Sequence, residues 1–70
     1  MKFKKVGENG HGPIVNVITD KGFCIGQIEK WAGLFVPTDW DGSKHHPCHK
    51  RNVAANQMEE RFEFERVSNT

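Results

Sequence analysis

The chain has 70 residues and is nearly neutral, with ten Lys and Arg residues, nine Asp and Glu residues, and four His residues. A chain of this length forms one domain, whose small core leaves a net stability of only about 3–5 kcal/mol. No apolar run approaches the roughly 18 residues of a membrane-spanning helix, and residues 1–5 are not followed by the apolar stretch of a signal peptide. We therefore expect a small cytoplasmic protein, and the near-zero net charge argues against a general binder of polyanions.

The first two thirds of the chain predict an N-terminal arm and three strands. Residues 1–13 are polar and glycine-rich, which is typical of a loose arm or a short edge strand. Residues 14–19 are β-branched apart from Asn16, and predict the first strand. Residues 23–30 predict the second, where Gly26 indicates a bulge or a close backbone approach, and residues 34–38 predict the third, with Pro37 at its end or on a sheet edge. Turn residues separate these strands at 20–22 and 32–33.

The last third of the chain predicts a helix. Four apolar residues recur there at helical spacing among good helix formers. They are Ala54, Ala55, Met58 and Phe62. The helix begins either at Pro47, which suits the first helical position, or with Asn52 as its N-cap. It continues to about residue 65, because no breaker interrupts it; the alternative is that residues 62–65 leave the helix as a short strand.

These elements predict an α+β fold, a three-stranded antiparallel β-meander followed by one C-terminal α-helix packed on the sheet. The domain spans residues 14–67, with an arm at 1–13 and a tail at 68–70. A sheet this small is only marginally stable alone, so we expect the apolar face of the helix to cover it.

Two short patterns suggest a resemblance. They are F-x-I-G-x-I at residues 23–28 and RNxAAxxM at residues 51–58. With the order β-β-β-α, they resemble small proteins encoded by bacteriophages and prophages. The order is also similar to that of the three-stranded, one-helix arm-binding domains of phage-type integrases, which tend to read DNA with basic and aromatic residues on the sheet face. The three predicted strands and the turns between them supply only Lys21 and Lys30.

The segment before the helix concentrates positive charge and histidine without an acidic residue. Its members are Lys44, His45, His46, His49, Lys50 and Arg51. A metal site would need Cys48 and two histidines to converge with Cys24 or His11, but adjacent ligands converge poorly and no CxxC pair is present. We expect no metal and no cofactor. Cys24 is predicted to be buried in a strand, and Cys48 to be more accessible.

The charges on the predicted helix oppose its macrodipole. The basic segment lies at its N-terminus, while Glu59 and Glu63 belong to an acidic second half. Such charges are suited to binding a partner. Free N–H groups and cations at the helix N-terminus favour an anionic partner, and the acidic half of the helix favours a basic surface. The alternative is that they only keep a small protein soluble.

The two tryptophans lie near predicted turns. Trp40, between two aspartates, is the better anchor for a partner, and Trp31 is the better cap for the core.

These features favour a non-enzymatic module that binds a larger protein. No catalytic set is apparent, because Cys48 and His49 are neighbours and lack the geometry of a nucleophile and its base. The leading hypothesis is a phage-encoded factor that binds and modulates or inhibits a host protein. The partner-binding candidates are Lys44, His45, His46, His49, Lys50, Arg51, Trp40, Glu59 and Glu63. The alternative is a nucleic-acid-binding protein that uses the basic segment, with Lys2, Lys4 and Lys5 as an arm.

Overall fold

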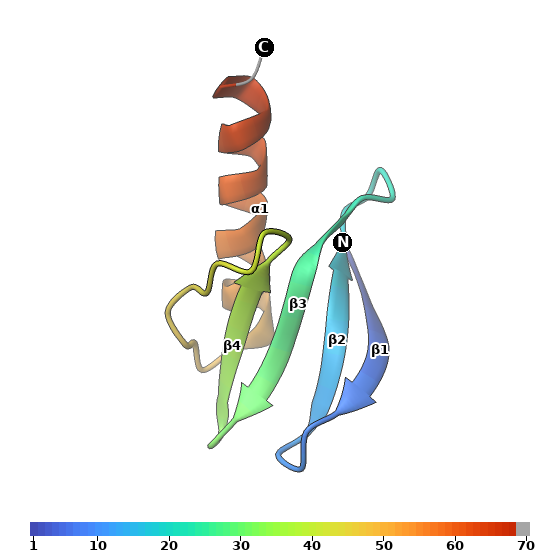
Figure 1. Cartoon of the computed structure of the whole chain (residues 1–70), viewed down its shortest axis with the longest axis vertical. Coiled ribbons are helices and arrows are strands. Elements are labelled where there is room, and N and C mark those ends of the chain that lie inside the picture. The colour runs from blue at the N-terminus through green and yellow to red at the C-terminus, as the bar shows by residue number, and fades with distance from the viewer. Residues whose placement is uncertain (69–70) are drawn as a thin grey trace.

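The computed structural model describes residues 1–68. They form four strands and one helix (Figure 1): β1 (Lys2–Glu8), β2 (Pro13–Ile18), β3 (Cys24–Trp31), β4 (Leu34–Asp39) and α1 (Arg51–Ser68). The strands make one antiparallel sheet in the order β1-β2-β3-β4, and α1 packs mainly on β3 and β4. The α+β class and the C-terminal helix are therefore confirmed. No helix within residues 1–68 combines the length and the apolar character that crossing a membrane requires.

The predicted number of strands is wrong, because residues 2–8 form β1 instead of a loose arm. β1 pairs with β2 from Lys2 to Glu8, with a bulge between Lys5 and Gly7. Its periodic signal is weak, since only Phe3 packs against the core from this strand. Backbone hydrogen bonds to β2 stabilise β1 where side-chain packing does not, because each strand added to a small sheet satisfies backbone groups of its neighbour. The structure therefore matches the edge-strand alternative.

Gly26 combines the two roles predicted for it. The register between β2 and β3 shifts between Val17 and Ile18, opposite the step from Cys24 to Gly26, which leaves Ile25 as the extra bulge residue. Gly26 has a φ of +138°, and a Cβ there would lie 2.1 Å from the Thr38 carbonyl oxygen and 2.6 Å from Met58 Cε. The absence of a side chain is what lets β3, β4 and α1 approach one another.

The core lies between the sheet and α1. Its buried apolar residues are Val15, Val17, Ile25, Ile28, Cys48, Ala54, Ala55 and Met58. The predicted helix stripe is confirmed, with Phe62 at its partly buried end. The helix begins at Arg51, between the two predicted starts, and continues to Ser68, so a strand at residues 62–65 is excluded. Its second half extends past the end of β4 (Figure 1).

The outer edge of β4 is covered by the segment that leads to the helix. Phe35 exchanges two backbone hydrogen bonds with Cys48, of 2.7 and 2.8 Å. Further along, the Pro37 carbonyl accepts from His45 N–H and Asp39 N–H donates to the Ser43 carbonyl. Pro37, which has no N–H to donate, therefore lies on an edge strand as predicted. Residues 43–48 act as an irregular fifth strand that protects this edge.

Candidate partner-binding surfaces

The basic segment is spread along the edge of β4 and does not form one compact patch. The side chains of Lys44, His46, His49 and Lys50 are exposed. Lys44 lines a hollow of about 390 Å³ on one side of the sheet, with Glu29, Trp31 and Val36. His49 and Lys50 line another hollow, of about 400 Å³, beside Phe35 and the start of α1.

Two members of the predicted basic site are engaged within the fold. His45 is half-buried, and its Nε2 lies 2.7 Å from Asp39 Oδ2. The Arg51 guanidinium lies 4.3 Å from the centre of the Phe3 ring, where a cation–π contact joins the start of α1 to β1. His45 is therefore drawn into the fold, whereas Arg51 is exposed despite its contact with Phe3. That the segment binds a partner stays a prediction.

An ionic cluster, which we call the clasp, joins the β4 end to the middle of α1. It comprises Asp39, Asp41, His45 and Arg61. The Asp39 side chain is fully buried, and its Oδ2 accepts from Arg61 Nη1 at 2.5 Å. Arg61 Nη2 also donates to Asp41 Oδ2 at 2.8 Å. Asp39 Oδ1 is buried and has no hydrogen-bond partner within residues 1–68. Because a buried carboxylate is costly unless it is paired, Arg61 holds this loop against the helix.

The clasp perturbs the ionisation of its outer members. The hydrogen bond from Arg61, followed by those from Ser43, lowers the pKa of Asp41 to about 2. The same carboxylates, Asp41 first and then Asp39, raise the pKa of Arg61 above its ordinary value. Arg61 therefore remains charged, and Asp41 remains a carboxylate except in strong acid.

Beside the clasp, three aromatic side chains form a surface that we call the aromatic ledge: Phe23, Trp40 and Phe62. The Trp40 and Phe62 rings meet edge to face with their centres 5.6 Å apart, and the Phe23 and Phe62 ring centres are 5.9 Å apart. Phe23 is 51% exposed and Trp40 is 45% exposed. Arg61 lies 5.3 Å from the centre of the Trp40 ring, so the clasp also orients the ledge.

The two predicted glutamates lie near the ledge. Glu59 is half-buried and Glu63 is exposed, and both line a hollow of about 150 Å³ together with Phe23 and Phe62. Glu63 forms an exposed ion pair with Arg66 at 3.2 Å. The structure thus brings Trp40, Glu59 and Glu63 to one end of the molecule, and it places the exposed members of the basic segment along the β4 edge and at the start of α1.

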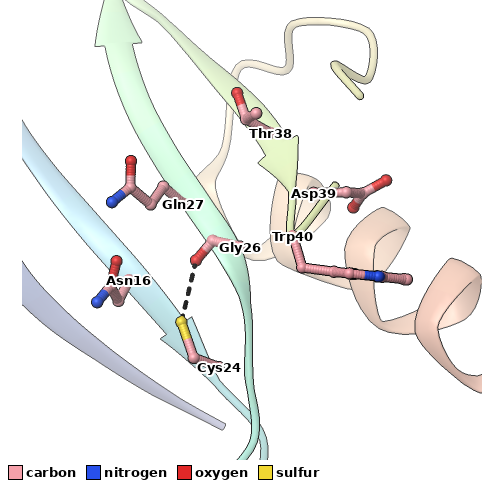
Figure 2. Close-up of a pocket in the computed structure, with 7 residues that line it drawn as sticks. All are labelled: Asn16, Cys24, Gly26, Gln27, Thr38, Asp39 and Trp40. Carbon is pink, nitrogen blue, oxygen red and sulfur yellow. Dashed lines mark hydrogen bonds between the residues drawn. The ribbon is translucent and has the colours of Figure 1, made fainter. Parts of the chain in front are cut away.

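On the face of the sheet that α1 does not cover, one cross-strand row is polar. Asn16, Gln27 and Thr38 lie directly opposite one another on β2, β3 and β4, and Figure 2 shows all three side chains on the same side. The register adds Lys4 on β1, and a bridge to Thr38 adds Lys44. We call these five residues the polar row. Part of the row lines a shallow hollow of about 410 Å³.

The cysteines are placed in the opposite way to the prediction. Cys24 is exposed and Cys48 is buried, and both are free thiols. Ile25 takes the buried position expected for Cys24 because the bulge in β3 turns Cys24 toward the helix-free face. Cys48 Sγ accepts from Gln57 Nε2 at 2.8 Å and lies 3.3 Å from the His46 carbonyl. Within residues 1–68, no group of three or more His, Cys, Asp or Glu side chains is arranged to hold a metal ion.

Sequence reasoning missed Phe23, Arg61 and the polar row as features of a surface. A period-2 reading of the strands would have found Asn16, Gln27 and Thr38 had the register been known, because each alternates with buried residues. No local signal joins Asp39 to Arg61, which lie 22 residues apart.

Comparison with known proteins leaves the fold and its surfaces as the basis for function. No protein-family model, no curated protein and no solved structure matches this chain.

Proposed function

We propose that this protein is a non-enzymatic interaction module of the kind that bacteriophages encode, which docks on a larger host protein and modulates or inhibits it. The observation that carries the proposal is the aromatic ledge. Binding hot spots are enriched in Trp, Tyr and Arg and lie in well-packed positions. The ledge presents Phe23 and Trp40 to solvent while Phe62 and Arg61 support them from the helix.

The ledge is also pre-organised. Its rings come from the β2–β3 turn, the β4 end and α1, three elements that the core and the clasp hold together. Rigid side chains lose little conformational entropy on binding, so more of the contact energy is retained as affinity.

Capture from a bacterial lysate with the immobilised protein tests this proposal. Wild type should retain one protein at stoichiometric amounts, and Phe23→Ser should reduce its capture about 30-fold, the effect of losing a hot-spot residue. The matched control is Phe64→Ser, because Phe64 is 70% exposed and lies outside the ledge. Equal capture by both variants, or recovery of nucleic acid alone, contradicts the proposal.

A second candidate function, binding of duplex nucleic acid, is favoured by the polar row. Amide side chains such as those of Asn16 and Gln27 can pair with adenine in the major groove. Lys4 and Lys44 stand at opposite ends of the row, four strand spacings or about 19 Å apart. This arrangement places cations on either side of the central strands, as contact with two phosphate backbones requires.

Titration of a DNA duplex of about two helical turns at several salt concentrations separates this candidate from the first. Each phosphate contact contributes about −0.9 to the slope of log affinity against log salt. The Lys4→Ala/Lys44→Ala variant should therefore have a slope smaller by nearly two. Binding that does not respond to salt, or a slope that is unchanged in this variant, excludes the row as a nucleic-acid surface.

A further inference from the structure

The sheet has one covered edge and one open edge. Along β4, the outward backbone groups of Phe35, Pro37 and Asp39 bond to residues 43–48. Along β1, which is the other end of the strand order, no segment within residues 1–68 pairs with the outer side. An open edge of this kind is a template for a further strand.

The charge of β1 decides which strand can be added. Lys2, Lys4 and Lys5 lie on this strand, and only Lys5 has an acidic partner on it, Glu8 at 2.5 Å. The register places Lys2 and Lys4 on the helix-free face, because they oppose Ile18 and Asn16 and alternate with Phe3. A second copy of β1 would bring lysines against lysines, so the charge of the edge disfavours self-pairing and favours an acidic strand.

The other face of β1 offers contact of a different kind. Between β1 and α1 lies a hollow of about 220 Å³, and it includes Phe3 from β1 and Ala55 and Asn56 from the helix. Asp20 and Glu59 also line it, and the Met1 ammonium group pairs with Asp20, so the hollow carries no excess of positive charge that would favour an acidic side chain. Side chains that project to this face from an added strand are therefore expected to be apolar.

We propose that the β1 edge binds an extended peptide segment of a partner protein by strand addition, and that this segment alternates acidic side chains on the helix-free face with apolar side chains on the helix face. Main-chain hydrogen bonds give such pairing its affinity, and alternate side chains give it specificity. The regular part of the edge is short, since the bulge after Lys5 interrupts it. The proposal goes beyond the proposed function, because the edge is a different surface from the aromatic ledge.

The direct test uses a fluorescent peptide of alternating Glu and Val residues, matched to β1 in length, with binding followed by anisotropy. We expect saturable binding and slowed hydrogen exchange of backbone amides in β1, measured by NMR. A peptide of alternating Lys and Val, and a Glu–Val peptide interrupted by proline, should both fail to bind, because one has the wrong charge and the other cannot complete the ladder. Absence of binding by the Glu–Val peptide, or binding of either control peptide with equal affinity, overturns the proposal.

Two charge reversals at opposite edges of the same face provide the matched controls. Lys4→Glu should weaken peptide binding about fivefold, the upper range for an exposed ion pair. Lys44→Glu changes the net charge equally but lies beyond the covered edge, so the affinity should change less than twofold. Both positions are exposed, and circular dichroism confirms that each variant is folded. An equal effect of the two reversals shows that the peptide senses only net charge and overturns strand addition.

The same peptide assay distinguishes this inference from the proposed function. Phe23→Ser should bind the peptide like wild type while it loses capture of the host protein. Failure of peptide binding with intact ledge-dependent capture removes the edge proposal alone, and failure of capture with intact peptide binding removes the ledge proposal alone.

Discussion

Removal of Arg61 should be the most damaging substitution of a charged residue in this protein. Arg61→Ala leaves the fully buried Asp39 carboxylate with His45 as its one remaining side-chain partner among residues 1–68. Removal of one member of a buried ion pair costs about 3–5 kcal/mol. Arg61 itself is 28% exposed, so we expect about 2–3 kcal/mol after solvent screening. A domain of this size has about 3–5 kcal/mol in total, so the variant should be close to unfolding.

Urea denaturation followed by tryptophan fluorescence measures this loss. Trp40 contacts Arg61 and Phe62, so its emission reports directly on the end of the molecule that is perturbed. A loss of 2–3 kcal/mol corresponds to a fall in Tm of roughly 10–20 °C, since about 4–8 °C accompanies each kcal/mol in a domain of this length. The urea midpoint should fall in proportion, without a change in the m-value.

Arg66→Ala is the matched control, because the one ion pair that Arg66 makes within the described part of the chain is with the exposed Glu63. Its cost should be below about 0.5 kcal/mol. The double variant Asp39→Asn/Arg61→Ala should regain about 1 kcal/mol or more over Arg61→Ala, because it removes the uncompensated buried charge. The reasoning is refuted if Arg61→Ala is as stable as Arg66→Ala, or if the double variant is less stable than Arg61→Ala.

Three further predictions concern the core, the bulge and acid stability. Gly26→Ala should leave little folded protein by circular dichroism, because its Cβ would lie 2.1 Å from a carbonyl oxygen of β4. The control Gly33→Ala, in open space at a φ of +81°, should lower the free energy of unfolding by only about 1–2 kcal/mol. Similar stability of the two variants would contradict the close-approach argument. Met58→Ala should lower the free energy of unfolding in urea by about 2–5 kcal/mol because Met58 is fully buried, and a loss under about 1 kcal/mol would show that the site collapses. Asp41 has a folded pKa of about 2, below its ordinary 3.8, so it stabilises the fold above the ordinary pKa, and that contribution is lost as the pH falls through the folded pKa. Thermal melts should show a weaker loss of stability between these pH values for Asp41→Asn than for wild type, and parallel curves would contradict the assignment.

The local features of this chain could be predicted because they depend on neighbouring residues. The β-branched run at residues 14–19 predicted β2, turn residues predicted the connections between β2, β3 and β4, and the recurrence of Ala54, Ala55, Met58 and Phe62 predicted the packed face of α1. Pro37 lacks an N–H donor and Gly26 lacks a side chain, so the places of both residues in the sheet were predicted correctly from residue type. The candidate site stays a prediction. The inward position of His45, beside Asp39, could not be foreseen, because the composition of a charged segment does not reveal which of its side chains turns inward.

Tertiary structure alone decided the remaining features. β1 exists because β2 offers it backbone partners, although its own side chains, lysines around a single inward Phe3, carry almost no periodic signal. The clasp depends on Asp39 and Arg61 meeting across 22 residues of sequence, and the bulge leaves Cys24 exposed and Ile25 buried. The sequence by itself determined a nearly neutral α+β domain with a strand-rich first half and a C-terminal helix. The register, the edges and the surfaces followed only from the three-dimensional fold, because pairing between distant residues is a property of the assembled sheet and not of any local segment.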